Sequence, residues 1–89
     1  MSEQSGELTP IKPARIAQEI TKLSAARRNG ELRPEVYDQR FAKMIHELRE
    51  RRIDGGRGEM TAALKPLLDA GDITAKEYDR LLTQLGMAG

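Results

Sequence analysis

A glycine followed six residues later by a glutamate is the strongest hint of metal chemistry in this sequence. Gly71 and Glu77 have the spacing of the sixth and twelfth positions of a helix–loop–helix calcium loop. The earlier ligands of such a loop would come from Pro66, Leu68 and Ala70, whose side chains carry no oxygen. Calcium is bound by several oxygen ligands, so we expect no calcium site here.

The sequence also lacks the residues needed for a zinc site or for nucleophilic catalysis. The chain has no cysteine and a single histidine, His46, whereas a structural zinc site takes four Cys or His ligands. Ser24 has no histidine at a useful spacing to activate it. The glycine-rich residues 55–58 lack the Gly-Lys-Ser/Thr ending of a phosphate-binding loop. We therefore expect no catalytic residue, metal, cofactor or small-molecule substrate, and no enzymatic activity.

Apolar residues at helical spacing indicate the elements that position these side chains. A first helix is expected from Pro13 to Asn29–Gly30, and a second from Pro34, because proline is tolerated in the first turn of a helix. A third should run over residues 59–70, with a kink or a late start at Pro66. Thr74 should cap a fourth helix, with Glu77 three residues later completing a capping box.

These elements predict an all-α protein of four helices, arranged as two tandem helix–turn–helix hairpins. We assign residues 1–10 to a flexible tail, 11–53 to hairpin one, 54–58 to a glycine-rich linker and 59–89 to hairpin two. Glycine costs about 1 kcal/mol in a helix interior, which favours a break at 54–58. The pattern leaves open whether the hairpins form one antiparallel bundle, move about the linker, or pair as a dimer.

Composition limits the size of the core and the location of the protein. The chain has 89 residues, of which 38% are hydrophobic and 33% charged, with a net charge of +1. A domain of this size buries a small share of its surface, so the core must be thin. No apolar run approaches the ~20 residues needed to cross a bilayer, and no secretory signal is visible. We expect a soluble cytoplasmic protein that does not bind membranes.

The two hairpins repeat each other at an offset of 41 residues. The shift places Gly30 on Gly71 and Tyr37 on Tyr78, and it also aligns the aliphatic residues Leu32 and Ile73. The glycines are expected to adopt positive φ and end the first helix of each hairpin. Leu32 and Ile73 should close the hairpin turns, and the tyrosines should pack on the first helix with their hydroxyls near water.

Residues 64–85 resemble the SHOCT (short C-terminal) domain. The shared pattern is a leucine-rich helix, Asp-Ala-Gly at residues 69–71, an aliphatic residue, Thr74, and then Glu77 and Tyr78 before further leucines. Residues 23–48 look like a degenerate copy, with Arg33 and Pro34 in place of the capping threonine and a longer second helix. The resemblance implies a module of bacterial or phage origin that mediates association, and it supplies no catalytic residues.

An apolar strip on the second helix is the best candidate for a binding surface. Such a strip either fills the core of a four-helix monomer or is buried against another subunit or a target helix, and the sequence does not decide between these. The strip and its charged rim consist of Tyr37, Phe41, Met44 and Leu48, with Arg40, Arg51 and Arg52. We therefore predict a non-enzymatic protein–protein interaction module: an adaptor, an inhibitor or an oligomerisation unit, with homodimers included.

Nucleic acid is the second candidate partner. Basic residues gather on and around the helix at 34–52, and helix–turn–helix hairpins can place a helix in a major groove. Acidic residues are interleaved with them, however: residues 1–58 carry a net charge of only +3, and residues 59–89 carry −2. A small nucleic-acid-binding regulator is therefore the alternative, and a solvated helix face is the simplest explanation of the charges.

Overall fold

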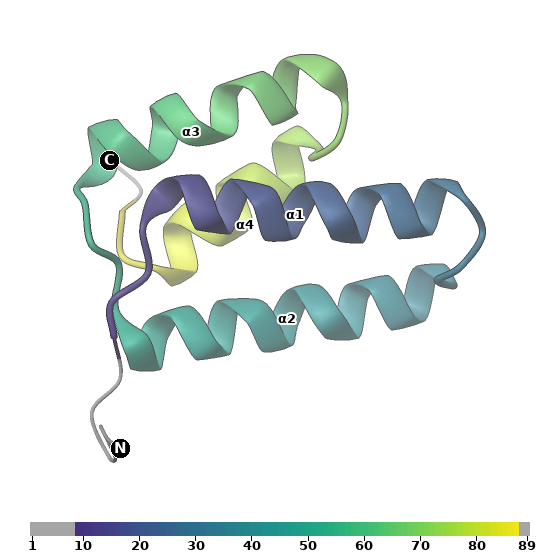
Figure 1. The fold of residues 1–89 in the computed structure, drawn as a ribbon, viewed down its shortest axis with the longest axis horizontal. Helices are drawn as coiled ribbons and strands as arrows, with labels where there is room; N and C mark the ends of the chain where they lie inside the picture. Colours follow the sequence, from purple (N-terminus) through teal and green to yellow (C-terminus); the bar gives the residue numbers. More distant parts are fainter. Residues whose placement is uncertain (1–8, 88–89) are drawn as a thin grey trace.

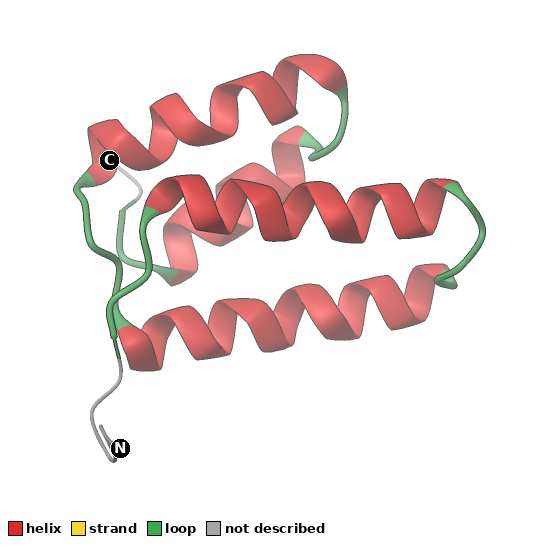
Figure 2. Ribbon diagram, in the orientation of Figure 1, coloured by secondary structure: helices red, strands yellow, loops and turns green. Residues whose placement is uncertain are grey.

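Four helices make up the fold, as the computed structural model shows for residues 9–87 (Figures 1 and 2). They are α1 (Pro13–Arg28), α2 (Pro34–Arg51), α3 (Arg57–Ala70) and α4 (Ala75–Gln84). No β-strand occurs in this range, which confirms the all-α prediction. The predicted tail lies outside the described residues except for Thr9 and Pro10. None of the helices in the described range has the length and apolarity needed to cross a membrane.

The two hairpins pack together into one bundle. Helix α1 contacts both α2 and α3, and α3 contacts α4. In Figure 1, α4 lies behind α1 and α2, while α3 runs above α1. Both hairpins contribute to a single buried core, composed of Ile16, Ile20, Tyr37, Phe41, Ile45, Leu48, Met60, Leu64, Leu67, Ile73, Leu81 and Leu82.

The connection between the hairpins is shorter than the predicted linker. Helix α3 begins at Arg57, so the last two residues of the segment 54–58 are helical. The Glu59 carboxylate accepts a hydrogen bond from the Gly56 N–H at 3.3 Å, and this satisfies an amide that the helix itself leaves unbonded. Pro66 lies inside α3 and does not delay the start of the helix.

A short backbone pairing joins the entry of α1 to the exit of α2. The Ile11 N–H donates to the Arg52 carbonyl at 3.1 Å, and the Asp54 N–H donates to the Ile11 carbonyl at 2.8 Å. These two bonds form an isolated parallel bridge between Ile11 and Ile53. Arg52 has a φ of 73°, which is strained for a residue with a side chain. This conformation ends α2 next to the N-terminal segment.

The hairpin turns repeat the same hydrogen bonds at the predicted offset. The Glu31 N–H donates to the Ala26 carbonyl at 2.8 Å, and 41 residues later the Asp72 N–H donates to the Leu67 carbonyl, also at 2.8 Å. The preceding Gly30 and Gly71 have φ values of 79° and 81°. The predicted left-handed glycines are therefore confirmed, as is the Thr74–Glu77 capping box.

Candidate functional site

The predicted apolar strip on α2 lies mostly inside the monomer. Tyr37, Phe41 and Leu48 are 1%, 0% and 3% exposed, and they belong to the core shared by the two hairpins. These three side chains are therefore unavailable to a partner in this structure. Of the two alternatives for the strip, a monomer core or a partner-binding surface, the monomer core explains their burial. Met44 is the exception, because it is only half-buried. The Met44 side chain lines a different face of the molecule, which is formed by hairpin one without hairpin two.

That face is a groove between α1 and α2, with a volume of about 790 Å³. Half-buried Leu23 and Met44 contribute to its lining, together with buried Ile16 and Leu48. Residues 9–12 line the groove at the end where α1 begins. No residue of α3 or α4 lines it, and α4 lies behind α1 and α2 in Figure 1. The groove thus opens on the side of hairpin one that the rest of the bundle leaves uncovered.

Basic side chains dominate the rim of this groove. Five basic residues line it against two acidic ones, although the whole chain has a net charge of only +1. Glu19 is already engaged, with its carboxylate 3.9 Å from Arg15 and 3.8 Å from Lys22. By contrast, Arg40 and Lys43 are exposed and have no ion-pair partner within 4.0 Å among residues 9–87. Within the described residues, these two rim cations therefore have no paired carboxylate.

The three predicted arginines do not form one cluster. Arg40 and Arg51 line the groove, and Arg51 donates from Nε to the Thr9 carbonyl at 3.0 Å. Arg52 instead lines a smaller depression of about 410 Å³ between the end of α2 and the end of α4. Arg49 lies beside it there. Only Arg40, Arg51 and Met44 of the predicted site therefore remain together as an accessible surface.

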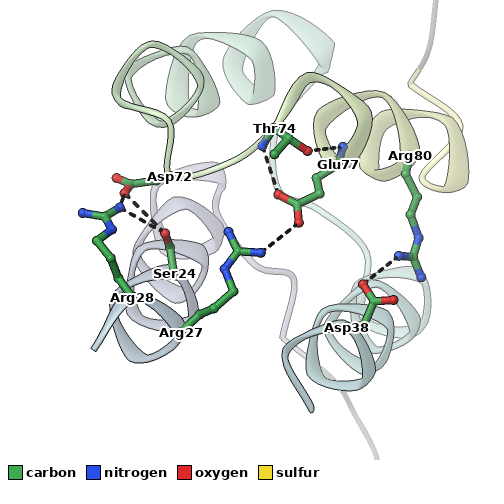
Figure 3. Close-up of polar contacts among 8 residues, drawn as sticks. All are labelled: Ser24, Arg27, Arg28, Asp38, Asp72, Thr74, Glu77 and Arg80. Carbon is green, nitrogen blue, oxygen red and sulfur yellow. Dashed lines mark hydrogen bonds and ion pairs between the residues drawn. The ribbon is translucent and has the colours of Figure 1, made fainter. Parts of the chain in front are cut away.

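A second group of polar residues joins the two hairpins (Figure 3). Ser24 on α1 is 2% exposed, and its hydroxyl donates to the Asp72 carboxylate at 3.4 Å. Arg28 forms an ion pair with the same carboxylate and donates to the Ser24 hydroxyl at 3.3 Å. These contacts tie the end of α1 to the turn of hairpin two. They satisfy a buried hydroxyl that would otherwise be costly to remove from water.

Arg27 makes the neighbouring contact between the hairpins. Its guanidinium carbon lies 3.9 Å from the centroid of the Tyr37 ring, and Nη1 lies 3.6 Å from the Glu77 carboxylate. The Tyr37 hydroxyl is buried with no hydrogen-bond partner, which corrects the expectation that it lies near water. Burial, followed by the negative charge of Glu77, raises the pKa of this phenol to about 12.

These inter-hairpin residues have the properties of a structural tie. Arg80 on α4 lies 3.9 Å from Asp38 on α2, so three separate ion pairs link hairpin one to hairpin two.

His46 lies on the outer face of α2, with its Nε2 atom 3.8 Å from the Glu50 carboxylate. Among the polar side chains in the described range, Ser24 forms hydrogen bonds only with Arg28 and Asp72. Nor do residues 9–87 contain a group of three His, Cys, Asp or Glu side chains placed to hold a metal ion.

Neither the groove nor the ties are predicted by the sequence, since each depends on contacts between separate helices. The available signals were weak. Met44 falls within the predicted apolar strip, so nothing local marks it as more exposed than Tyr37 or Phe41, and the pairs of the tie are 42 to 50 residues apart in the chain.

Comparison with known proteins finds no matching family model, no matching curated protein and no matching solved structure. The resemblance of residues 64–85 to the SHOCT domain therefore remains a prediction.

Proposed function

We propose that this protein is a non-enzymatic interaction module that binds another protein through the groove between α1 and α2. The observation that carries the proposal is the position of Leu23 and Met44: they are apolar, half-buried and aligned along an uncovered groove, while the main strip of α2 already fills the core. Apolar surface rimmed by polar residues is typical of protein-binding sites.

The resemblance to the SHOCT domain supports the same function, because that family is associated with protein assembly. The resemblance is also consistent with different roles for the two hairpins. Hairpin two carries the resemblance and the complete capping box, whereas hairpin one carries the groove. A second copy of the chain would be one such partner, and this would make the protein a homodimer.

Site-specific photo-crosslinking in the source cells tests the proposal. A crosslinking residue in place of Glu47, which is exposed and lines the groove, should yield a discrete adduct with another protein or a second copy. The same residue in place of Lys76, exposed on α4, is the matched control. Met44→Glu should abolish the adduct formed at position 47. Equal adducts from both positions, or an adduct that persists with Met44→Glu, would refute binding through the groove.

A further inference from the structure

The shape of the groove sets the length of what can lie in it. Its lining extends from Lys12, the residue just before α1, to Leu23 on that helix, and from Arg40 to Arg51 on α2. Each stretch advances 11 residues, or about 17 Å at the rise of an α-helix. A segment of about three helical turns therefore matches the groove from end to end. Helices commonly dock in this way, with apolar residues spaced at i, i+3 and i+4 facing the groove.

The charge on the rim sets the chemistry of that segment. Lys43 and Arg40 lie on the α2 side without an acidic partner among residues 9–87, whereas Arg15, across from them on α1, is paired with Glu19 at 3.9 Å. Charged surfaces that associate are complementary, so carboxylates are the groups expected opposite these side chains. The apolar lining requires that the same segment also present hydrophobic residues. Acidic and apolar faces on one helix satisfy both conditions.

The groove fits a protein helix better than a nucleic acid. Glu19 and Glu47 lie inside the lining, where they would face a phosphate backbone at close range and oppose it. A helix can avoid these two carboxylates, because its side chains vary along its length and a phosphate backbone does not. The half-buried Leu23 and Met44 also match aliphatic side chains, whereas a phosphate backbone offers them no apolar partner.

We propose that the groove binds an acidic amphipathic helix of another protein, about three turns long. Its apolar face lies on Leu23 and Met44, and its carboxylates face Arg40 and Lys43. This inference rests on the proposed function and adds to it the chemistry of the partner. The affinity is then sensitive to salt, because exposed charges are screened over about 8 Å at physiological ionic strength.

Titration of the isotope-labelled full-length protein with synthetic peptides tests this inference. The probe is an acetylated helical peptide of about twelve residues, with leucines on one face and glutamates beside them. A matched peptide carries lysines in place of the glutamates. We expect the acidic peptide to shift the amide resonances of α1 and α2 that border the groove, with little change in α3. Its affinity should exceed that of the basic peptide by about tenfold or more at low salt.

Charge reversal on the rim provides the matched variants. Arg40→Glu with Lys43→Glu should weaken binding of the acidic peptide about tenfold and strengthen binding of the basic one. Arg33→Glu with Lys76→Glu makes the same change of charge outside the groove and should leave both affinities unaltered. If the charge-reversed variant fails to fold, Arg40→Gln with Lys43→Gln replaces it in the test. This variant removes both positive charges without adding negative charges that would repel the other carboxylates of α2.

Each other outcome overturns the inference in a recognisable way. Equal binding of both peptides in the groove would refute the acidic partner while leaving the proposed function intact. Binding of a DNA duplex or an RNA oligonucleotide, with no binding of either peptide, would identify a nucleic-acid site instead. Absence of peptide binding alongside a specific adduct at position 47 would show a protein partner of different chemistry. Loss of both the adduct and peptide binding would remove the proposed function as well.

Discussion

Arg27 stacks on the ring of Tyr37 at 3.9 Å while its guanidinium reaches the Glu77 carboxylate at 3.6 Å. One side chain thus touches both hairpins: the ring belongs to α2 and the carboxylate to α4. Arg27→Ala should lower the free energy of unfolding by about 1 kcal/mol, through loss of the cation–π contact and of a partly buried ion pair. Chemical denaturation measures this loss. Lys43→Ala, which removes an exposed cation from α2, should change stability by less than about 0.5 kcal/mol. Equal effects would contradict the role of Arg27 as a tie.

The hydroxyl of Tyr37 should contribute nothing favourable to stability at neutral pH. It is buried without a hydrogen-bond partner, so Tyr37→Phe removes a polar atom that lost its water on folding. We expect unfolding free energy to stay constant or to rise slightly, by up to about 1 kcal/mol. A marked loss of stability would show that the hydroxyl is bonded in solution. Tyr78→Phe, at the equivalent half-buried position of hairpin two, is the control.

The same residue should make the protein sensitive to alkali. The pKa of Tyr37 rises from its ordinary value of 10.0 to about 12 on folding. Ionisation is therefore harder in the folded state, so this group leaves stability unchanged below pH 10 and lowers it as the pH rises toward 12. The decline should be on the order of 2 kcal/mol and absent from Tyr37→Phe. Ultraviolet titration of the phenolates checks the raised pKa, and unfolding curves across this range check the decline.

The hairpins should respond differently to changes at their equivalent capping positions. Thr74 accepts a hydrogen bond from the Glu77 N–H at 3.1 Å and caps α4. Thr74→Ala should cost about 1 kcal/mol, the usual value of such a cap. Arg33 holds the equivalent position before α2 and makes no side-chain capping bond. Arg33→Ala is therefore the matched control and should leave the melting temperature almost unchanged. A similar loss in both variants would argue against a specific cap.

Substitutions at Phe41 and Met44 should distinguish the role of the core from the role of the groove. Phe41 is fully buried, and Phe41→Ala should destabilise the protein by about 3–5 kcal/mol, enough to unfold much of a marginally stable domain. Met44→Ala should cost less, about 1 kcal/mol, because the side chain is only half-buried. If the groove binds a partner, Met44→Ala should still weaken that binding while the fold persists. Denaturation followed by circular dichroism measures which of the two variants loses more unfolding free energy.

Gly55 should be the least replaceable glycine of the interhairpin connection. A Cβ atom there would lie 3.0 Å from the ring of Pro13 and 3.0 Å from the Glu59 carboxylate, at a φ of +156°. We expect Gly55→Ala to destabilise the protein by about 1–3 kcal/mol. A Cβ at Gly58, within α3, would meet nothing within 4 Å. Gly58→Ala should therefore stabilise the protein, by up to about 1 kcal/mol, since alanine favours the helix. Thermal unfolding of both variants tests this contrast.

The sequence predicts the helices well because their signals are local. Pro34 begins α2, Gly30 and Gly71 adopt positive φ, and Thr74 caps α4, each from contacts within a few residues. The two turns, which lie 41 residues apart, also share their hydrogen bonds. Each of these features depends on a proline, a glycine or a short polar side chain whose preference persists in most surroundings.

The site could not be predicted in the same way. The exposure of Tyr37 and Met44 depends on where α4 packs, and no local pattern encodes that placement. Residues on one helix face looked equivalent, yet hairpin two covers Tyr37 and leaves Met44 half-exposed. The predicted start of α3 at residue 59 is two residues late: glycine favours a break, whereas the Glu59 carboxylate bonds the Gly56 amide and allows the helix to begin at Arg57.

The ties between the hairpins are asymmetric, although the hairpins are copies of one unit. Arg28 pairs with Asp72 across the interface. Exchanging each residue for its equivalent in the other hairpin gives Asp69 and Glu31, two acids that cannot form an ion pair. A pair of two copies of hairpin two would set Asp69 against Asp72, whereas two copies of hairpin one would keep opposite charges at Arg28 and Glu31. The Arg28–Asp72 pair therefore has no mirrored counterpart in the same chain, and the contact between the hairpins resembles a heterodimer interface within one polypeptide.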